Sequence, residues 1–169
     1  MDWRKENLQK FLVLKETRKG KAVFSKAEIR KDSFIILFTG DIYTKDQYLA
    51  RADRDNNHFL QIDTESFMGP SWGIDDFINH SCDPNCGLIY SGDKIGLFAI
   101  RHIQKGEEIC FDYSTTMAED FWEMACLCGA GNCRKMIRDF KHLPLPTQQR
   151  YISLNIVAPF ISSNFKTHT

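Results

Sequence analysis

No charge of one sign dominates this sequence: 22 lysines and arginines balance 22 aspartates and glutamates, so the formal net charge is zero. Binding driven by phosphate groups normally needs a clear basic surplus, so the composition disfavours nucleic acid as the main partner. Residues 1–21 also contain no uninterrupted apolar stretch of signal-peptide or membrane-span length. We therefore expect an intracellular protein, in the cytoplasm or the nucleus, with no membrane partner.

The chain has neither an internal repeat nor the glycine-rich strand-to-helix turn of dinucleotide-binding folds. It has instead many short apolar segments, which predict strands at residues 11–14, 22–24, 34–38, 88–90, 94–99 and 108–112. Ser91-Gly92-Asp93 predicts the turn of a hairpin, and residues 67–72 predict another turn.

Helices are predicted mainly at the periphery of these strands. The expected segments are residues 46–57 after a Thr44 cap, 118–124, one or two turns at 136–140, and a final helix capped by Thr147 and ended by Pro159. A length of 169 residues allows one core and a small appendage. The sequence therefore predicts a mainly β, α+β domain.

Six cysteines are clustered in the second half of the chain: Cys82, Cys86, Cys110, Cys126, Cys128 and Cys133. In a reducing compartment, clustered cysteines indicate metal ligands before disulfides. The spacing Cys126-x-Cys128-x4-Cys133 places three thiols in one small loop that suits a tetrahedral Zn²⁺ ion. Either Cys82 or Cys86 could supply the fourth ligand, whereas Cys110 lies in an apolar strand and is expected to be inert.

Two further segments carry a family resemblance. Residues 79–85, Asn-His-Ser-Cys-Asp-Pro-Asn, and residues 106–113, Gly-Glu-Glu-Ile-Cys-Phe-Asp-Tyr, resemble the paired signature of the SET-domain lysine methyltransferases. The cysteine loop resembles that family's post-SET zinc loop, and the resemblance implies that Cys82 is the fourth zinc ligand. It extends over about residues 10–135.

The resemblance implies a fold of small curled antiparallel sheets with a C-terminal pseudoknot. The expected division is a SET domain at residues 10–117 with an insert at about 44–66, a post-SET zinc loop at 118–136, and a helical extension at 137–169. The implied reaction moves a methyl group from S-adenosylmethionine to the amine of a lysine in a protein or peptide. Histones are among the candidate substrates.

The resemblance also implies roles for individual residues. Tyr113 is expected to be the main catalytic residue, with Phe111 and His58 beside it. His58 stands where the family often has a tyrosine, and Phe111 stands where the family has Phe or Tyr, so more room for di- or trimethylation is expected. The methyl donor is expected to contact Gly20, Lys21, Ala22, Asn79, His80, Tyr113 and Leu127. Ala22 replaces the second glycine of the family's Gly-x-Gly turn.

Other interpretations are open. Without the motif, Tyr113 could equally be a buried structural tyrosine. His80 could be a satisfied core histidine even with the motif. Ala22 and His58 favour a non-catalytic SET-like module that binds peptides or partners. A zinc-dependent nucleic-acid binder is disfavoured by the zero net charge. A zinc hydrolase is disfavoured because four thiolates leave no coordination position for water.

Overall fold

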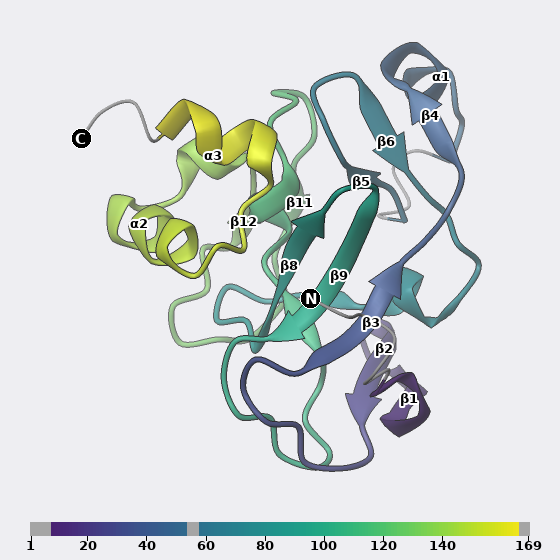
Figure 1. Cartoon of the computed structure of the whole chain (residues 1–169), viewed down its shortest axis with the longest axis vertical. Helices are drawn as coiled ribbons and strands as arrows, with labels where there is room; N and C mark the ends of the chain where they lie inside the picture. The colour runs from purple at the N-terminus through teal and green to yellow at the C-terminus, as the bar shows by residue number, and fades with distance from the viewer. Residues whose placement is uncertain (1–7, 54–57, 166–169) are drawn as a thin grey trace.

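The computed structural model describes residues 8–53 and 58–165 (Figure 1). A short 3-10 helix, η1 (Leu8–Phe11), leads into the antiparallel hairpin β1 (Leu12–Thr17) and β2 (Gly20–Ser25). The turn needs a positive φ of +100° at Gly20, which a glycine adopts without strain. The two strands predicted for this region are confirmed.

The central sheet has the order β3-β9-β8 and is antiparallel. Its strands are β3 (Phe34–Phe38), β8 (Cys86–Ser91) and β9 (Lys94–Ala99). The predicted hairpin is confirmed, with Gly92 at φ +60° in its turn. Ile35, Leu88 and Leu97 are fully buried, so this sheet carries the main hydrophobic core.

A second sheet, of order β4-β6-β5, is formed by β4 (Ile42–Thr44), β5 (Leu60–Gln61) and β6 (Ser66–Met68). The helix α1 (Lys45–Leu49) follows β4, and Thr44 caps it in a reciprocal box with Gln47, as predicted. The expected extension of this helix is wrong where the structure describes it. Only Tyr48 of α1 is buried, so the helix has little apolar face to support a longer run.

The turn predicted at residues 67–72 begins two residues later in the structure. Phe67 and Met68 belong to β6, because Phe67 pairs with strands on both sides and its ring stacks on Tyr48 with centroids 4.0 Å apart. The turn itself starts at the cis peptide bond between Gly69 and Pro70. Residues 54–57 of the predicted helix lie outside the described part of the chain.

Two short strands pair in parallel: β7 (Asn79–His80) and β10 (Cys110–Phe111). The strand predicted at 108–112 is thus shorter than expected. The 3-10 helix η3 (Ile74–Phe77) precedes β7, and η4 (Tyr113–Thr116) follows β10. This pairing brings together segments about thirty residues apart in the sequence.

The helix predicted at 118–124 is wrong. The Ala118 amide donates to Gln61 Oε1 at 2.9 Å, and the Asp120 amide donates to Asp139 Oδ2 at 2.8 Å. Asp120 also has φ +64°. The left-handed backbone at Asp120 interrupts a right-handed helix at its third residue, and the two long-range bonds hold the segment in this conformation. The segment ends in a strand, β11 (Met124–Ala125).

The helix predicted at 136–140 is also wrong in its first half, because Met136 and Ile137 form β12 (Met136–Ile137), antiparallel to β11. The 3-10 helix η5 (Phe140–His142) follows. The cysteine loop lies between the two strands of this hairpin, and the Cys126 amide donates to the Lys135 carbonyl at 2.8 Å. The pairing, rather than local preference, therefore determines the conformation here.

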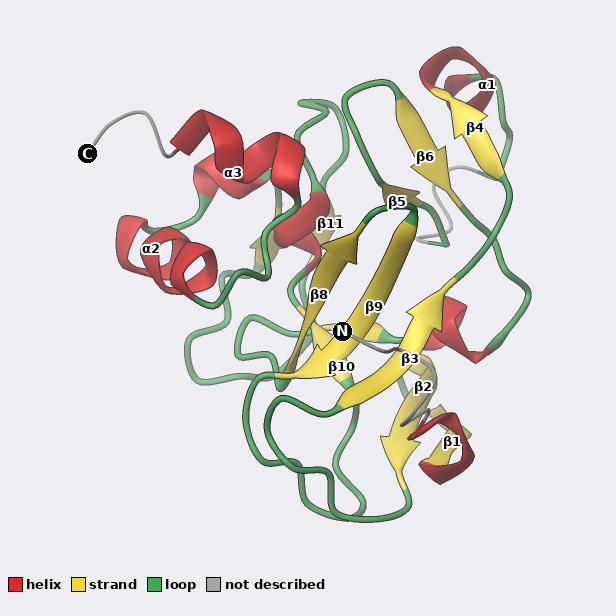
Figure 2. Ribbon diagram, in the orientation of Figure 1, coloured by secondary structure: helices red, strands yellow, loops and turns green. Residues whose placement is uncertain are grey.

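Two helices end the described chain, α2 (Leu145–Ser153) and α3 (Pro159–Phe165). The first begins before Thr147, with Pro144 at its cap, and Pro159 opens the second helix instead of ending the first. Both predictions are wrong for one reason. Amide groups in the first turn of a helix have no acceptor within the helix, so proline, which lacks an amide hydrogen, is tolerated there. Figure 2 shows these helices on one side of the β3-β9-β8 sheet, opposite α1.

The C-terminal helices have a hydrophobic core of their own, built on Phe140, Tyr151 and Ile161. It packs onto β8 at Gly87, where a Cβ atom would lie 2.4 Å from Ile156 Cγ2. The predicted fold class, mainly β with a short C-terminal helix, is confirmed, and the C-terminal extension contains two such helices. Within the described residues no helix is long and apolar enough to cross a membrane.

Candidate active site

The parallel pair β7 and β10 brings the two sequence motifs into contact. Asn79 is opposite Cys110, and His80 is opposite Phe111. Asn85 holds the same segments together, since its Nδ2 donates to the Glu108 carbonyl at 2.7 Å and its Oδ1 accepts from the Cys110 amide at 3.0 Å. Asn85 is 1% exposed, so these bonds are shielded from water.

A wide cavity of about 480 Å³ opens beside this pair. Residues from several segments line it, among them Lys19, Lys21, Asn79, His80, Glu108 and Leu127. The Asn79 side chain donates to the Lys21 carbonyl and to Glu108 Oε1, each at 3.0 Å. Asn79 therefore fixes the β1–β2 turn against the end of the second motif.

Five of the seven residues expected to contact a donor line this cavity: Lys21, Asn79, His80, Tyr113 and Leu127. Gly20 and Ala22 do not belong to its lining, and Ala22 is 1% exposed, with its methyl group packed into the protein. The alanine therefore does not narrow the cavity. Sequence reasoning missed Lys19, Glu108 and Phe77, and the Lys21 ammonium lies 5.1 Å from the centroid of the Phe77 ring.

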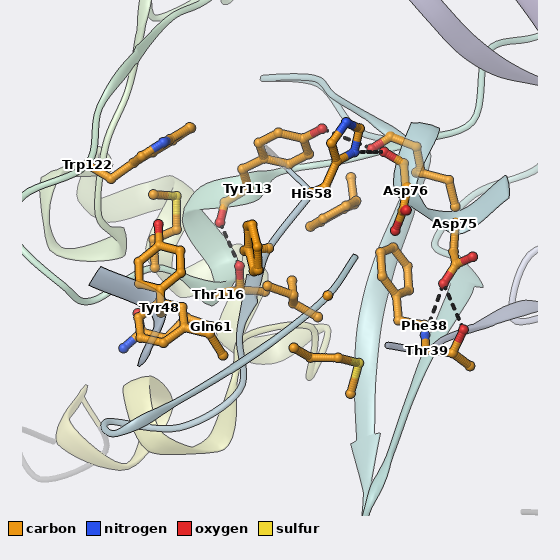
Figure 3. Close-up of a pocket in the computed structure, with 18 of the residues that line it drawn as sticks. Phe38, Thr39, Tyr48, His58, Gln61, Asp75, Asp76, Tyr113, Thr116 and Trp122 are labelled. Atoms are coloured by element: carbon orange, nitrogen blue, oxygen red, sulfur yellow. Dashed lines mark hydrogen bonds between the residues drawn. The ribbon is translucent and has the colours of Figure 1, made fainter. Parts of the chain in front are cut away.

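A second cavity, of about 60 Å³, is narrow and largely aromatic (Figure 3). Its wall includes Phe38, Tyr48, Phe59, Phe67, Phe111 and Trp122. Tyr113, His58 and Asp76 line both cavities. These three residues therefore mark the place where the two cavities meet.

Tyr113 is held at this junction by its backbone and its hydroxyl group. The hydroxyl donates to the Ile78 carbonyl at 3.0 Å, and the Tyr113 amide donates to His80 Nδ1 at 3.1 Å. Burial raises the pKa of Tyr113, so the phenol remains protonated. In Figure 3 its ring points from η4 toward His58.

His58 and Phe111 both line the narrow cavity. His58 Nδ1 is 3.1 Å from the Asp76 carbonyl oxygen, so this nitrogen carries the proton and donates. Its ring lies against Phe77, with centroids 5.6 Å apart. Phe111 is 3% exposed, and its ring centroid is 5.0 Å from that of Tyr113 and 5.7 Å from that of Phe38.

Four cysteines form one group. The sulfur atoms of Cys82, Cys126, Cys128 and Cys133 all lie within 4.8 Å of one another, and those of Cys82 and Cys126 are 3.7 Å apart. Tetrahedral zinc with Zn–S bonds of about 2.3 Å needs sulfur separations of roughly 3.8 Å. The donor set and its size therefore fit a zinc ion. Cys86 and Cys110 lie outside this group, so the geometry favours Cys82 as the fourth ligand.

His80 links the cysteine group to the site. Its Nδ1 accepts from the Tyr113 amide, so the proton lies on Nε2, which is 3.3 Å from Cys82 Sγ and can donate to it. Burial lowers the pKa of His80 to about 4, so the ring is neutral. The histidine thus contacts both the proposed metal ligand and the backbone of Tyr113.

Asp112 is a second link, which sequence reasoning missed although the residue stands in the quoted motif. Its carboxylate is 1% exposed and accepts from Arg134 Nη2 at 2.8 Å, the Ser114 amide at 3.1 Å and the Tyr151 hydroxyl at 3.1 Å. Arg134 follows the cysteine loop, and its amide lies 3.4 Å from Cys82 Sγ. One buried carboxylate therefore joins η4, the cysteine loop and helix α2.

Small sheets surround a parallel strand pair, and two cavities meet at a tyrosine beside a four-cysteine group. Residues 20–114 match the family described as the SET domain, and the chain belongs to that family. It is similar to a "Probable histone-lysine N-methyltransferase set-23" of Caenorhabditis briggsae, with 29% identity over 76% of this chain and 61% of the relative.

Two further relatives are much longer. A "Variant-silencing SET domain-containing protein" of Plasmodium falciparum is 32% identical over 76% of this chain and 6% of its own length. A "Histone-lysine N-methyltransferase, H3 lysine-36 specific" of Homo sapiens is 28% identical over 82% of this chain and 6% of its own length. The chain thus spans less than two thirds of the length of each of these relatives.

Proposed function

We propose that this chain transfers methyl groups from S-adenosylmethionine to the side-chain amine of lysine in a protein, with histones among its substrates. The observation that carries the proposal is the meeting of a wide cavity and a narrow aromatic cavity at Tyr113. A transfer between two ligands needs them to approach from two sides in line, which this arrangement allows. The family and the printed names of the relatives support the same activity.

The wide cavity suits the methyl donor, which supplies a methyl group on a sulfonium and carries an amino-acid end with both charges. Lys19 and Lys21 are cations of the cavity wall, and Glu108 is an anion of it. Together they complement a carboxylate and an ammonium group. Asn79 and His80 hold the surrounding backbone in place, and Leu127 contributes an apolar surface from the cysteine loop.

The narrow cavity suits the aliphatic stem of a lysine. The amine must lose its proton before transfer, although its unperturbed pKa is about 10.4. An aromatic wall that excludes water favours the neutral amine. The Tyr113 hydroxyl and the Ile78 and Asp76 carbonyl groups gather at the junction, where fixed oxygen dipoles stabilise charge developing on nitrogen.

The degree of methylation is proposed from Phe111. A tyrosine at this position would add a hydroxyl group beside Tyr113 and Phe38, whereas the phenylalanine leaves that space apolar and open. A methylated amine is larger than an unmethylated one and has fewer protons to donate. An apolar space beside Tyr113 therefore accommodates methyl-lysine as the substrate of a further transfer. We therefore expect di- or trimethylated lysine as a product.

Zinc is proposed as a structural ion held by Cys82, Cys126, Cys128 and Cys133. Four thiolates complete its coordination, so the metal has no open position for chemistry. Its role would be to fix the segment carrying Leu127 over the wide cavity. The division of the chain into a SET domain, a post-SET zinc loop and a C-terminal helical extension is part of the same proposal.

The test is incubation of the purified chain with radiolabelled S-adenosylmethionine and mixed histones, beside Tyr113→Phe and Tyr43→Phe variants. Tyr43 lies in β4 and lines neither the wide nor the narrow cavity, so it serves as the matched control. We expect label on lysine, a fall of about a hundredfold for Tyr113→Phe, and little change for Tyr43→Phe, because loss of one oriented polar group at a reacting centre has that size. Mass spectrometry of the product should show di- or trimethyl-lysine. Only monomethyl product would contradict the role of Phe111.

The rival interpretation, a peptide-binding module without transfer, predicts a different result. It requires no label on any lysine and no binding of the methyl donor measured by calorimetry. Equal transfer by the wild-type chain and Tyr113→Phe would instead leave the methyltransferase intact and remove the role given to the hydroxyl group.

A further inference from the structure

Glu119 is a carboxylate of the substrate-side wall that the proposed transfer does not use. It lines the narrow aromatic cavity six residues after Tyr113. Its Oε2 atom is buried and has no hydrogen-bond partner among the described residues. A buried carboxylate oxygen without a donor is costly, so such an atom in a cavity wall indicates a donor that arrives with a ligand.

Asp139 is a second carboxylate in the same condition. It is 4% exposed, its Oδ2 accepts from the Asp120 amide at 2.8 Å, and its Oδ1 is buried without a partner among the residues described. Asp139 lines a third cavity, of about 310 Å³. Trp122 belongs to the wall of both this cavity and the narrow one, so Glu119 and Asp139 lie on adjoining spaces.

The other acidic residues of this region are already neutralised. Asp120 forms an ion pair with Lys141, and Glu123 pairs with Arg138 at 2.8 Å. Glu119 and Asp139 have no such pair, and burial together with Asp139 raises the pKa of Glu119 to about 7, although Lys45 acts in the opposite direction. Glu119 and Asp139 are therefore two carboxyl groups of this region that no ion pair among the described residues neutralises.

The shape and the walls of the third cavity indicate what could supply the missing cation. Trp122 and Phe121 line it, and aromatic faces attract guanidinium and ammonium groups. Its wall also contains His142 and Arg138, and Arg138 is already paired with Glu123. The volume suits one long side chain. The cavity adjoins the space proposed for the target lysine, so a peptide crossing both would place a neighbouring side chain in it.

We propose that the cavity lined by Trp122 and Asp139, which adjoins the narrow cavity lined by Glu119, binds a second cationic side chain of the protein substrate. Arginine and lysine share the required chemistry, and arginine also offers several donors for two carboxylates. The inference rests on the proposed function, because it concerns a residue near the methylated lysine. It makes Glu119 a residue that determines which lysines are methylated.

The test uses peptide libraries with a central lysine and one fixed residue at each of three positions on either side. In one pair of libraries the fixed residue is arginine or its neutral analogue citrulline. In the other pair it is lysine or its neutral analogue acetyl-lysine. We expect the wild-type chain to methylate the arginine or lysine set about tenfold faster than the matching neutral set at one position, as one charge-assisted contact allows. Comparison of the rates for the arginine and lysine libraries then shows which of the two cations the cavity prefers.

Variants locate the preference. Glu119→Gln and Asp139→Asn keep the side-chain shapes, and each should reduce the tenfold preference to less than threefold. Glu28→Gln makes the same chemical change at an exposed residue outside these cavities and should leave the preference intact. Equal rates for the charged and neutral sets with the wild-type chain would overturn the subsite, as would an unchanged preference in both cavity variants.

Binding measurements separate this inference from the proposed function. The same peptides, labelled with fluorescein, are titrated with the chain and S-adenosylhomocysteine, and fluorescence anisotropy gives the affinities. Absence of transfer with a retained preference for the cationic peptides would overturn the enzyme and support the subsite. Equal affinity for charged and neutral peptides, or no binding of either, would overturn the subsite.

Discussion

Glu119 has a consequence for stability that is independent of any substrate. Its pKa is about 7 in the folded chain and 4.5 in the reference state, because burial favours the protonated form. Below pH 4.5 the group is protonated in both states and costs nothing. As the pH rises toward 7 only the unfolded chain releases the proton, so the folded state loses stability, and above 7 the loss is constant.

We therefore expect Glu119→Gln to be more stable than the wild-type chain at pH 8 and nearly equal to it at pH 4. The difference at pH 8 should be about 2 kcal/mol, after allowance for partial solvent screening. Urea denaturation at the two pH values measures it, with Glu28→Gln as the control. A variant less stable than the wild-type chain at pH 8 would contradict the burial of an unpaired charge.

Helix α2 contributes one hydroxyl group to the active-site region. Tyr151 is fully buried, and its hydroxyl donates to Asp112 Oδ2 at 3.1 Å. The other oxygen of Asp112 accepts from Arg134 Nη2 and lies 3.4 Å from His80 Nδ1. The backbone supports the same contact, since the Ala158 amide donates to the Thr115 carbonyl at 2.9 Å. The terminal helices therefore brace η4, which begins with Tyr113.

Tyr151→Phe should lower the free energy of unfolding by about 1–3 kcal/mol, because a buried carboxylate loses a donor. It should also lower turnover, since Asp112 positions the residues around Tyr113. Tyr90→Phe is the matched control: the Tyr90 hydroxyl is buried without a partner among the described residues, so its removal should be neutral or stabilising. Thermal unfolding and methyl transfer measure both variants. Equal effects would show that the hydroxyl of Tyr151 has no special role.

The elements that the sequence predicted correctly are those with enough residues to show a period. The hairpin β8–β9 and the strand β3 have five or six residues each, with apolar side chains and a turn that contains Gly92. Strands of two residues, such as β11 and β12, have no period to recognise. Their conformation depends on pairing across the cysteine loop, and local preference favoured a helix instead.

The same limit applies to the site. Tyr113, Asn79 and His80 were identified because they stand in contiguous motifs, and the structure places them on one wide cavity. Asp112 has partners 22 and 39 residues further along the chain, and neither contact leaves a local signal. Glu119 was missed for a related reason: its important property is the lack of a partner, and only burial reveals it.

The molecule as a whole has separate hydrophobic clusters around the site. The central sheet, the terminal helices and the cysteine group each bury a set of their own. The proposed metal therefore stabilises the cysteine hairpin without carrying the main core. The cluster around it contains Cys82, Met117, Cys126 and Ile137 and packs against Tyr113.

Removal of zinc with a chelator should abolish most methyl transfer while the far-ultraviolet circular dichroism changes little. Cys82→Ser should lower the zinc content measured by elemental analysis, and Cys86→Ser, an equally buried cysteine outside the group, should leave one zinc ion per chain. Full activity of the chelated protein would contradict the link between the metal and the site. Equal zinc loss in both variants would contradict the ligand assignment.

The parallel pairing of β7 with β10 also has a consequence for the order in which the candidate site can form during synthesis. Between these strands lies the hairpin β8–β9, which forms from local contacts and joins β3 in the central sheet. Formation of the hairpin shortens the loop that separates Asn79 from Cys110, so the loop-closure cost of their pairing falls. Cys126 and Tyr151 come later still in the chain. A growing polypeptide therefore acquires its central sheet first. The wall of its wide cavity is complete only after the cysteine loop has been synthesised.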